Sequence, residues 1–353
     1  MSNHEFSRRR FLKTSIAGAM ATPLAGSGLV AAAPEPAAPA GDPLAADADA
    51  GSVNGMPYRM LGKTGAKVSL LGVGGYHIGV QASPQDSVRI IRMAIDEGVN
   101  FLDNAWEYNG GRSEERMGLA LQDGYRAKVF LMTKVCGRDA KTAEAQINES
   151  LKRLKTDVID LLQFHETNYD NDPDLVFGKD GAVHAVLKAK EKGKVRFIGF
   201  TGHKSPHIHL KMLAKENFPW DTVQMPLNLM DAHYRSFARE VLPEAAKRGM
   251  GVIAMKAAGG DGRFIREAGL TASDCLRYVM GLAGVSVVLS GLDKVEVAKE
   301  NIAIAKAFKP FTDAERTSLL AKVSDAAGDG RFERFKSTQD FDSKVHREQH
   351  KLL

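Results

Sequence analysis

The chain has 353 residues, 44% of them hydrophobic, which is enough for one large domain with a sizeable core and does not require two. Four basic residues between positions 8 and 13, set against Glu5, account for +3 of the +5 net charge, so the rest gives no reason to expect a nucleic-acid partner. Two cysteines, with no C-x-x-C pair, exclude a disulfide framework, an iron–sulfur cluster and a cysteine-rich zinc site.

Residues 1–33 have the pattern of an export signal. The basic run SRRRFLK (Ser7 to Lys13) is followed by TSIAGAMATPLAGSGLVAAA, an apolar stretch that ends in small residues. The basic run resembles the S-R-R-x-F-L-K pattern of twin-arginine signals, whose export machinery moves folded proteins. We therefore expect a periplasmic protein cleaved after Ala33. A retained membrane anchor is the alternative, but Pro23 and several glycines interrupt the stretch, and no other segment is long enough for stable membrane insertion.

Residues 34–55 are predicted to be a flexible linker rich in proline and alanine, because PEPAAPAGDPLAADADA has too few large apolar groups to pack. The folded domain is expected over residues 56–330. Residues 331–353 are predicted to be a polar C-terminal tail, and their sequence gives no indication of the oligomeric state.

From Met56 onward, short β-branched runs alternate with amphipathic helical runs. Helical periodicity is clearest at 86–98, 140–155 and 236–249. An open doubly wound sheet would normally carry a phosphate fingerprint after its first strand, and LGVGGYHIG lacks the G-x-G-x-x-G order. Eight strand–helix units in a row favour an α/β fold of the (β/α)8 TIM barrel type. The predicted strands lie at 68–75, 100–105, 129–135, 158–165, 195–202, 222–228, 251–257 and 285–291.

Three polar residues lie at the predicted ends of successive strands. Asp103, Lys134 and His165 follow one another in two steps of 31 residues, about one strand–helix unit each. Barrels place functional side chains at the carboxyl ends of their strands, and adjacent strands are only about 4.8 Å apart. We therefore expect these side chains to meet at the barrel mouth, with Tyr108 reaching over them from the following loop.

This group of side chains suits proton delivery to a carbonyl oxygen. The phenol of Tyr108 is a weak acid at neutral pH, and we expect the ammonium of Lys134 to stabilise its phenolate. Asp103 would keep Lys134 charged and aimed, while His165 would donate to the carbonyl oxygen. Taken singly, each residue has a structural alternative: a helix cap for Asp103, a solvated charge for Lys134 and a buried core side chain for His165. Together they indicate hydride transfer to an aldehyde or ketone.

The segments YRMLGKTGAKVSLLGVGG and GVNFLDNAWEYNGGRSEERMGLAL resemble the first strand region and the catalytic segment of aldo-keto reductases, and the resemblance extends over most of residues 57–310. It implies an N-terminal β-hairpin, a C-terminal helical extension, a small carbonyl substrate and a catalytic tetrad of Asp103, Tyr108, Lys134 and His165. It also implies a nicotinamide dinucleotide across the barrel mouth, NADP(H) or possibly NAD(H).

The resemblance further implies a set of cofactor contacts, with three departures from the family pattern. Val297 stands where many members have Arg or Gln, so a 2′-phosphate contact would fall to Lys294 or be absent. Strand 5 ends in FTGH, which leaves Thr201 and His203 for the carboxamide, and Met255 replaces an aromatic residue near the nicotinamide. The expected contacts are Gly74, Thr201, Gln224, Met255, Gly291, Lys294, Glu300 and Asn301.

The substrate pocket is expected to involve Tyr76, His77, Trp106 and the loops 167–180 and 258–269. Ordinary packing is the alternative for each of them, above all for tryptophan, which is commonly buried.

No metal site is predicted. The stretch GHKSPHIHL places three histidines close together, at positions 203, 207 and 209, but two of them fall on the helix that follows the strand, away from the strand ends where barrel metal ligands are expected. The thiol of Cys136 lies beside Lys134 at the rim and is interpreted as incidental.

A second functional hypothesis is an exported module that binds nicotinamide nucleotides or senses redox state with little turnover. The export signal and the altered cofactor contacts favour it, because the periplasm has no evident supply of NADPH. A cofactor carried out inside the folded protein and recycled by a second substrate would reconcile the two hypotheses.

Overall fold

The structure is a computed structural model that describes residues 49–260 and 262–352. The predicted export signal and residues 34–48 of the predicted linker lie outside this part of the chain.

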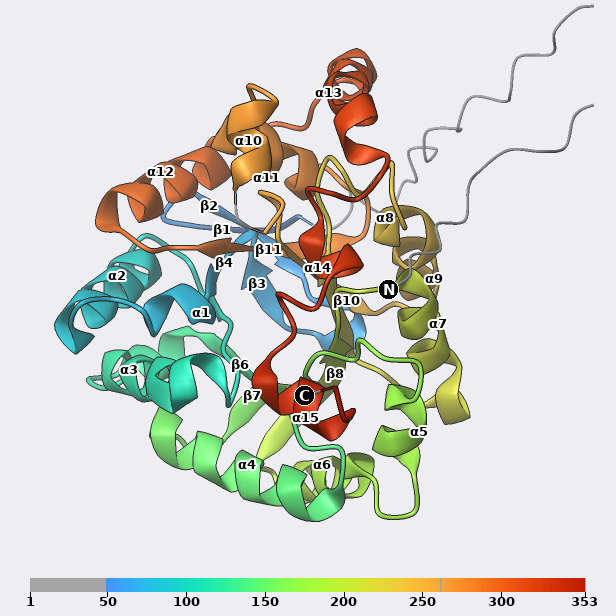
Figure 1. Ribbon diagram of the computed structural model, residues 1–353. Coiled ribbons are helices and arrows are strands. Elements are labelled where there is room, and N and C mark those ends of the chain that lie inside the picture. Colours follow the sequence, from blue (N-terminus) through green and yellow to red (C-terminus); the bar gives the residue numbers. More distant parts are fainter. Residues whose placement is uncertain (1–48, 261, 353) are drawn as a thin grey trace, which may run out of the picture. The chain divides into compact units, whose positions relative to one another are not determined.

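Eight parallel strands close into a barrel surrounded by helices (Figure 1). Successive strands are hydrogen-bonded neighbours, and β11 pairs with β4 to close the ring. Each predicted strand overlaps one of them, so the predicted (β/α)8 barrel is confirmed. The strands are β4 (Leu71–Gly74), β5 (Phe101–Leu102), β6 (Phe130–Val135), β7 (Ile159–Phe164), β8 (Val195–Thr201), β9 (Thr222–Pro226), β10 (Gly251–Met255) and β11 (Val285–Gly291).

Alternation along the strands determines what faces the inside of the barrel. In β6, Phe130 and Met132 belong to the cluster that fills the interior, while Leu131 and Val135 pack outward against the helices. Side chains of a strand point to opposite faces in turn, so Lys134 falls on the inner face, at the carboxyl end. The same spacing carries Phe101 of β5 to Asp103, and Leu161 of β7 to His165. The remaining residues of the inner cluster are Leu61, Val68, Ile253, Val287 and Leu289.

A small antiparallel sheet precedes the barrel. It contains β1 (Asp49–Val53), β2 (Met56–Met60) and β3 (Lys67–Ser69), and so includes the predicted N-terminal hairpin. The predicted linker therefore reaches too far, because β1 pairs with β2 through a turn at Asn54 and Gly55. Both turn residues have positive φ, 51° and 79°, and Asn-Gly is the pair that a tight hairpin favours.

The helices lie outside the strands, as the alternating pattern predicts. Helix α4 begins where the Asp139 side chain accepts a hydrogen bond from the Thr142 amide. The region 236–249, predicted as one helix, is divided into α8 and α9 near Pro243, which cannot continue a helical hydrogen-bond ladder. The helices up to residue 327 are α1 (Gly75–Ile78), α2 (Pro84–Asp96), α3 (Arg112–Ala120), α4 (Ala140–Leu154), α5 (Asp172–Phe177), α6 (Ala182–Glu191), α7 (Pro206–Ala214), α8 (Phe237–Glu240), α9 (Leu242–Lys247), α10 (Arg263–Glu267), α11 (Ala272–Met280), α12 (Val295–Lys306) and α13 (Asp313–Ala327).

Residues 331–352 fold over the barrel mouth, where α14 (Arg334–Ser337) and α15 (Lys344–Gln349) lie in front of the strands (Figure 1). We call this segment the C-terminal cover. The sequence interpretation treats it as a polar tail, but Phe335, Lys336 and His346 are buried. The expected helical extension is thus present and takes part in the mouth of the barrel. Within the described residues, none of the helices has the length and apolar character to cross a membrane.

Candidate active site

The centre of the mouth is organised by a buried lysine. The Lys134 ammonium donates to the Asp103 carboxylate, to the Asn104 carbonyl oxygen at 2.7 Å and to the Tyr108 hydroxyl at 3.2 Å. Lys134 is fully buried and Asp103 is 4% exposed, so the ion pair is shielded from water and strongly constrained. The structure thus brings Asp103, Lys134 and Tyr108 into contact, as their positions at the strand ends predict.

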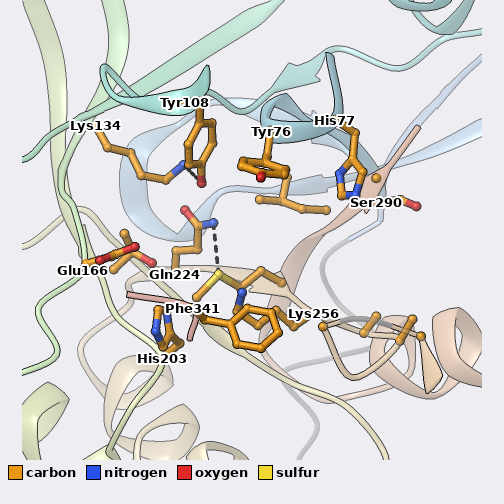
Figure 2. Close-up of a pocket in the computed structure, with 18 of the residues that line it drawn as sticks. Tyr76, His77, Tyr108, Lys134, Glu166, His203, Gln224, Lys256, Ser290 and Phe341 are labelled. Carbon is orange, nitrogen blue, oxygen red and sulfur yellow. Dashed lines mark hydrogen bonds between the residues drawn. The ribbon is translucent and has the colours of Figure 1, made fainter. Parts of the chain in front are cut away.

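Tyr108 reaches this cluster from a tight loop. It begins the short 3-10 helix η3 (Tyr108–Gly111), in which Asn109 has a positive φ of 56°. Figure 2 shows its hydroxyl beside the Lys134 ammonium. Burial, and after it the carboxylates of Asp103 and Glu107, raise the pKa of the Tyr108 phenol well above its usual range. Burial and these charges keep Tyr108 protonated, and the expected stabilisation of its phenolate by Lys134 does not outweigh them.

His165 is held by a residue that the sequence analysis did not consider. Its Nδ1 lies 3.0 Å from Glu107 Oε1. Burial lowers the pKa of His165, so the ring is neutral at neutral pH. Burial alone raises the pKa of Glu107, but the hydrogen bond from His165 outweighs it and the pKa falls to about 2.

The ionised Glu107 accepts the Nδ1 proton of His165, which assigns the tautomer. The Nε2 atom of the neutral ring is then an acceptor. This arrangement does not provide the donor to a carbonyl oxygen that we expected from His165.

A cavity of about 970 Å³ opens beside these residues, between the barrel rim and the C-terminal cover. Tyr76, His77, Tyr108 and Lys134 line it (Figure 2). His165 also lines it. Its size is at the upper end of the range of small-molecule sites, which suits an extended cofactor and a substrate. Of the expected cofactor contacts, those that line the cavity are Thr201, Gln224, Met255, Gly291, Glu300 and Asn301.

Gln224 and Asn301 present polar groups to this cavity. Gln224 Nε2 lies 3.5 Å from the Met255 sulfur, a weak contact, and its Oε1 is buried without a hydrogen-bond partner in the described part of the chain (Figure 2). Asn301 donates to the Ser290 hydroxyl at 2.8 Å, which orients its amide. A buried, unpartnered carboxamide oxygen is costly, so Gln224 fits a ligand that supplies a donor.

Two expected cofactor contacts lie outside the cavity lining. A Cβ on Gly74 would meet the Ser290 carbonyl oxygen at 2.9 Å, so the glycine permits the close approach of β4 and β11. Lys294 precedes α12 and is exposed. The sequence pattern placed both near the cofactor because it follows chain order and does not show which residues face the cavity.

The substrate-pocket prediction is correct only in part. Trp106 does not line the cavity: its indole nitrogen donates to Glu149 at 2.6 Å, and Arg153 lies over its ring. The loop 167–180 does not line it either, whereas residues of the loop 258–269 do. The first of these loops supports the C-terminal cover, because Tyr169 donates to Asp342 at 2.6 Å.

Lys256 and Glu166 are charged residues of the cavity that we did not predict. Lys256 follows β10, has a φ of 58° and lies 5.1 Å from the ring centroid of Phe341 (Figure 2). Burial lowers its pKa to about 8. Burial, with the neighbouring charge of Glu107, raises the pKa of Glu166 well above its usual range. The strand-end rule applied to GVIAMKA could have identified Lys256.

The C-terminal cover supplies the remaining wall of the cavity, with residues 340–345. Asp342 anchors it: His203 Nε2 lies 3.0 Å from its Oδ1, and Lys204 donates to its other oxygen. His203, expected near the carboxamide, is therefore engaged by the cover, while His207 is exposed and His209 packs against Phe237. No pattern in the sequence indicated this wall.

The buried polar side chains lie at the carboxyl ends of the parallel strands, where α/β barrels carry their functional sites. The aldo/keto reductase family profile matches residues 70–268, more than half of the chain, so the chain belongs to the aldo/keto reductase family.

Among curated proteins, the chain is similar to L-galactose dehydrogenase of Arabidopsis thaliana, with 32% identity over 210 residues covering 55% of this chain and 63% of that one. An aldo-keto reductase of Bacillus subtilis strain 168 is 31% identical over 205 residues, covering 54% and 58%. The chain therefore spans less than two thirds of the length of these relatives.

Solved structures show the same fold. An aldo-keto reductase from Bacillus halodurans in its holo form has a TM-score of 0.64 at 24% identity and covers 79% of this chain and 99% of its own. An aldo/keto reductase from Klebsiella pneumoniae, solved with NADP and acetate, has a TM-score of 0.63 at 22% identity and covers 74% and 94%.

Proposed function

We propose that this protein reduces an aldehyde or ketone by hydride transfer from a nicotinamide cofactor, with Tyr108 as the proton donor. The observation that carries the proposal is the buried Lys134, which contacts Asp103 on one side and the Tyr108 hydroxyl on the other, inside a cavity large enough for both cofactor and substrate. Membership of the aldo/keto reductase family supports the same chemistry.

Each residue of the site has a role in this reaction. When bound, a reduced nicotinamide dinucleotide would supply the hydride for the carbonyl carbon. Tyr108 transfers its hydroxyl proton to the carbonyl oxygen as negative charge develops there. The phenolate that remains lies 3.2 Å from the Lys134 ammonium, which stabilises it until a proton returns from solvent. Asp103 keeps Lys134 charged, so the pair stabilises the product state of the proton transfer.

The cavity fits the cofactor. Gln224, with its unpartnered carboxamide oxygen, would hold the nicotinamide amide. Glu300 and Asn301 line the cavity from α12. Lys256 adds a positive charge, which suits the diphosphate. NADP(H) is supported by the relative solved with NADP, and Lys294, being exposed outside the cavity, leaves the recognition of a 2′-phosphate open.

We further propose that the protein is exported through the twin-arginine pathway, because SRRRFLK precedes an apolar stretch that ends in small residues. Replacing Arg8 and Arg9 together by lysine is expected to keep the chain uncut in the cytoplasm, while the wild type is recovered from the periplasm beginning near Pro34. Fractionation with N-terminal sequencing measures both. Equal export of the variant would contradict this pathway.

The test of the catalytic proposal is NADPH oxidation, followed by absorbance, with a panel of aldehydes, ketones and quinones. Tyr108→Phe is expected to lower turnover by about 10²- to 10⁴-fold, the usual contribution of a general acid, and to retain NADPH binding in a fluorescence titration. Tyr125→Phe, a change on the surface helix η4 (Tyr125–Lys128), is the matched control. Tight NADPH binding by a wild type that reduces no carbonyl compound would favour the nucleotide-binding or redox-sensing alternative.

A further inference from the structure

Four metal-ligating side chains converge behind the proton-donor tyrosine. Glu107, Cys136, His165 and His346 each offer one ligand atom, and these atoms all lie within 4.8 Å of one another. His165 Nδ1 lies 3.0 Å from Glu107 Oε1 and 3.8 Å from Cys136 Sγ. Three of the residues follow successive strands, β5, β6 and β7, and the fourth belongs to α15 of the C-terminal cover.

The donors have the spacing and environment of a coordination site. In a tetrahedral zinc site, the bond lengths to N, O and S place the ligand atoms about 3.3 to 3.8 Å from one another. Side-chain rotations that move these atoms by about 1 Å would therefore give the cluster tetrahedral geometry. Cys136, His165 and His346 are buried, and the Glu107 side chain is 10% exposed. Among the ion pairs of the described residues, Glu107 is paired with His165 and not with a lysine or arginine.

The neighbouring cations are paired with carboxylates outside the cluster. Lys134 is paired with Asp103, and Arg138 donates to Asp172 at 2.7 Å. The charge of Glu107, with that of a Cys136 thiolate, is therefore available to a divalent ion.

The ring of His346 is poorly satisfied by the protein. Its Nε2 atom is buried and has no hydrogen-bond partner in the described part of the chain. Its Nδ1 atom lies 3.5 Å from an Arg138 guanidinium nitrogen, at the limit of a hydrogen bond. A fully buried imidazole in this state is costly unless another group binds it.

We propose that Glu107, Cys136, His165 and His346 bind one divalent transition-metal ion of the Zn²⁺ type. Mixed thiolate, imidazole and carboxylate ligands in a four-coordinate set suit zinc. Four protein ligands leave no open position, so the ion has a structural role: it ties α15 to the ends of β6 and β7 and holds the C-terminal cover over the cavity. On binding, the Cys136 thiol releases its proton to solvent, and the proton of the neutral His165 ring moves from Nδ1 to Nε2.

Coordination also changes the hydrogen bonding of His165, a consequence that rests on the proposed function. With the ion on Nδ1, the proton of the neutral ring resides on Nε2. His165 then presents an N–H donor, which the metal-free arrangement with Glu107 does not. The donor to the carbonyl oxygen expected from the sequence is thereby restored.

The test uses the full mature chain, freed of metal with a chelator and titrated with Zn²⁺ in competition with a chromophoric chelator, and separately with Co²⁺. We expect one ion per chain, a Kd below about 1 µM and, with Co²⁺, a near-ultraviolet thiolate-to-metal charge-transfer band. Cys136→Ser is expected to abolish this band and to weaken Zn²⁺ binding by at least about 100-fold. His346→Gln is expected to weaken binding and to make residues 331–352 cleavable by protease even with Zn²⁺ present.

Matched controls are Cys275→Ser, which changes the other buried cysteine, and His207→Gln, which changes an exposed histidine. Both should bind Zn²⁺ like the wild type. A wild type that binds no Zn²⁺, or variants at Cys136 and His346 that bind it unchanged, would overturn the proposal. Circular dichroism shows whether each variant folds, and thermal unfolding of the wild type with and without Zn²⁺ gives a readout that needs no variant. None of these measurements depends on carbonyl reduction, so failure of the metal-site proposal can be distinguished from failure of the proposed function.

Discussion

The barrel rim and the C-terminal cover face each other across one cavity, but they are held in place differently. At the rim, Asp103 and Lys134 project from strands whose other inner side chains form an apolar cluster. In the cover, position is determined by buried charges: Lys336 donates to Asp231 at 2.7 Å and to Glu333 at 2.9 Å. The rim inherits its geometry from a regular framework, whereas the cover depends on a few specific ion pairs.

The largest effects are expected where one cation of a buried pair is removed. Lys134→Met removes the cation paired with Asp103, and Lys336→Met removes the cation paired with both Asp231 and Glu333. Each should cost about 3 to 5 kcal/mol in the free energy of unfolding, measured in urea, because an unpaired charge remains buried. A loss below about 1 kcal/mol for Lys336→Met, with the full loss for Lys134→Met, would show that the cover unfolds separately from the barrel.

A smaller effect is expected at the anchor of the cover. Asp342→Asn weakens the contacts with His203, Lys204 and Tyr169, and should cost about 1 to 3 kcal/mol at pH 7. Burial raises the pKa of Asp342, but the hydrogen bonds from His203, Lys204 and Tyr169 outweigh it, and the net shift is downward.

The direction of that shift determines the pH dependence. A lowered pKa means that the stabilisation is complete above the ordinary carboxyl pKa of about 4 and is lost as the pH falls below it. The difference in free energy of unfolding between wild type and Asp342→Asn should therefore shrink between pH 5 and pH 3. A difference that is constant across this range would assign the role of Asp342 to packing.

The smallest effect is expected for an exposed pair far from the mouth. Lys188 of α6 lies 3.1 Å from Glu144 of α4, and both side chains are about half exposed. Lys188→Ala should change the free energy of unfolding by less than about 0.5 kcal/mol, since exposed pairs contribute little. A larger change would mean that burial is not what makes the ion pairs at the mouth more stabilising than this exposed one.

The barrel could be predicted from the sequence because the hydrophobic patterns of its strands and helices are local and periodic. Inward residues of β6 alternate from Phe130 to Lys134, and the helices between strands carry apolar faces, so strand ends and the residues on them follow directly. The same rule identifies Lys256 after β10, and the pair Asn54-Gly55 identifies the turn between β1 and β2, within the residues predicted as linker. Neither was predicted, although both signals are present.

The cover could not be predicted in this way. Asp342 lies 139 residues from His203, and Lys336 lies 105 residues from Asp231. No periodic pattern links such partners, and the segment 331–352 has the polar composition of a tail. Burial of paired charges gives it structure, and pairing of that kind depends on the fold already being formed. For the same reason, the sequence does not indicate that Glu107 and His346 lie close together.

The cover follows every barrel strand along the chain, which has a consequence for the order of synthesis. When the ribosome has made β11, every strand of the barrel exists, but residues 331–352 do not, and domains can begin to fold as they emerge. Residues 331–352 therefore cannot form their wall of the cavity until translation has passed them. Once they dock, the buried ion pairs of Asp342 and Lys336 hold them at the mouth.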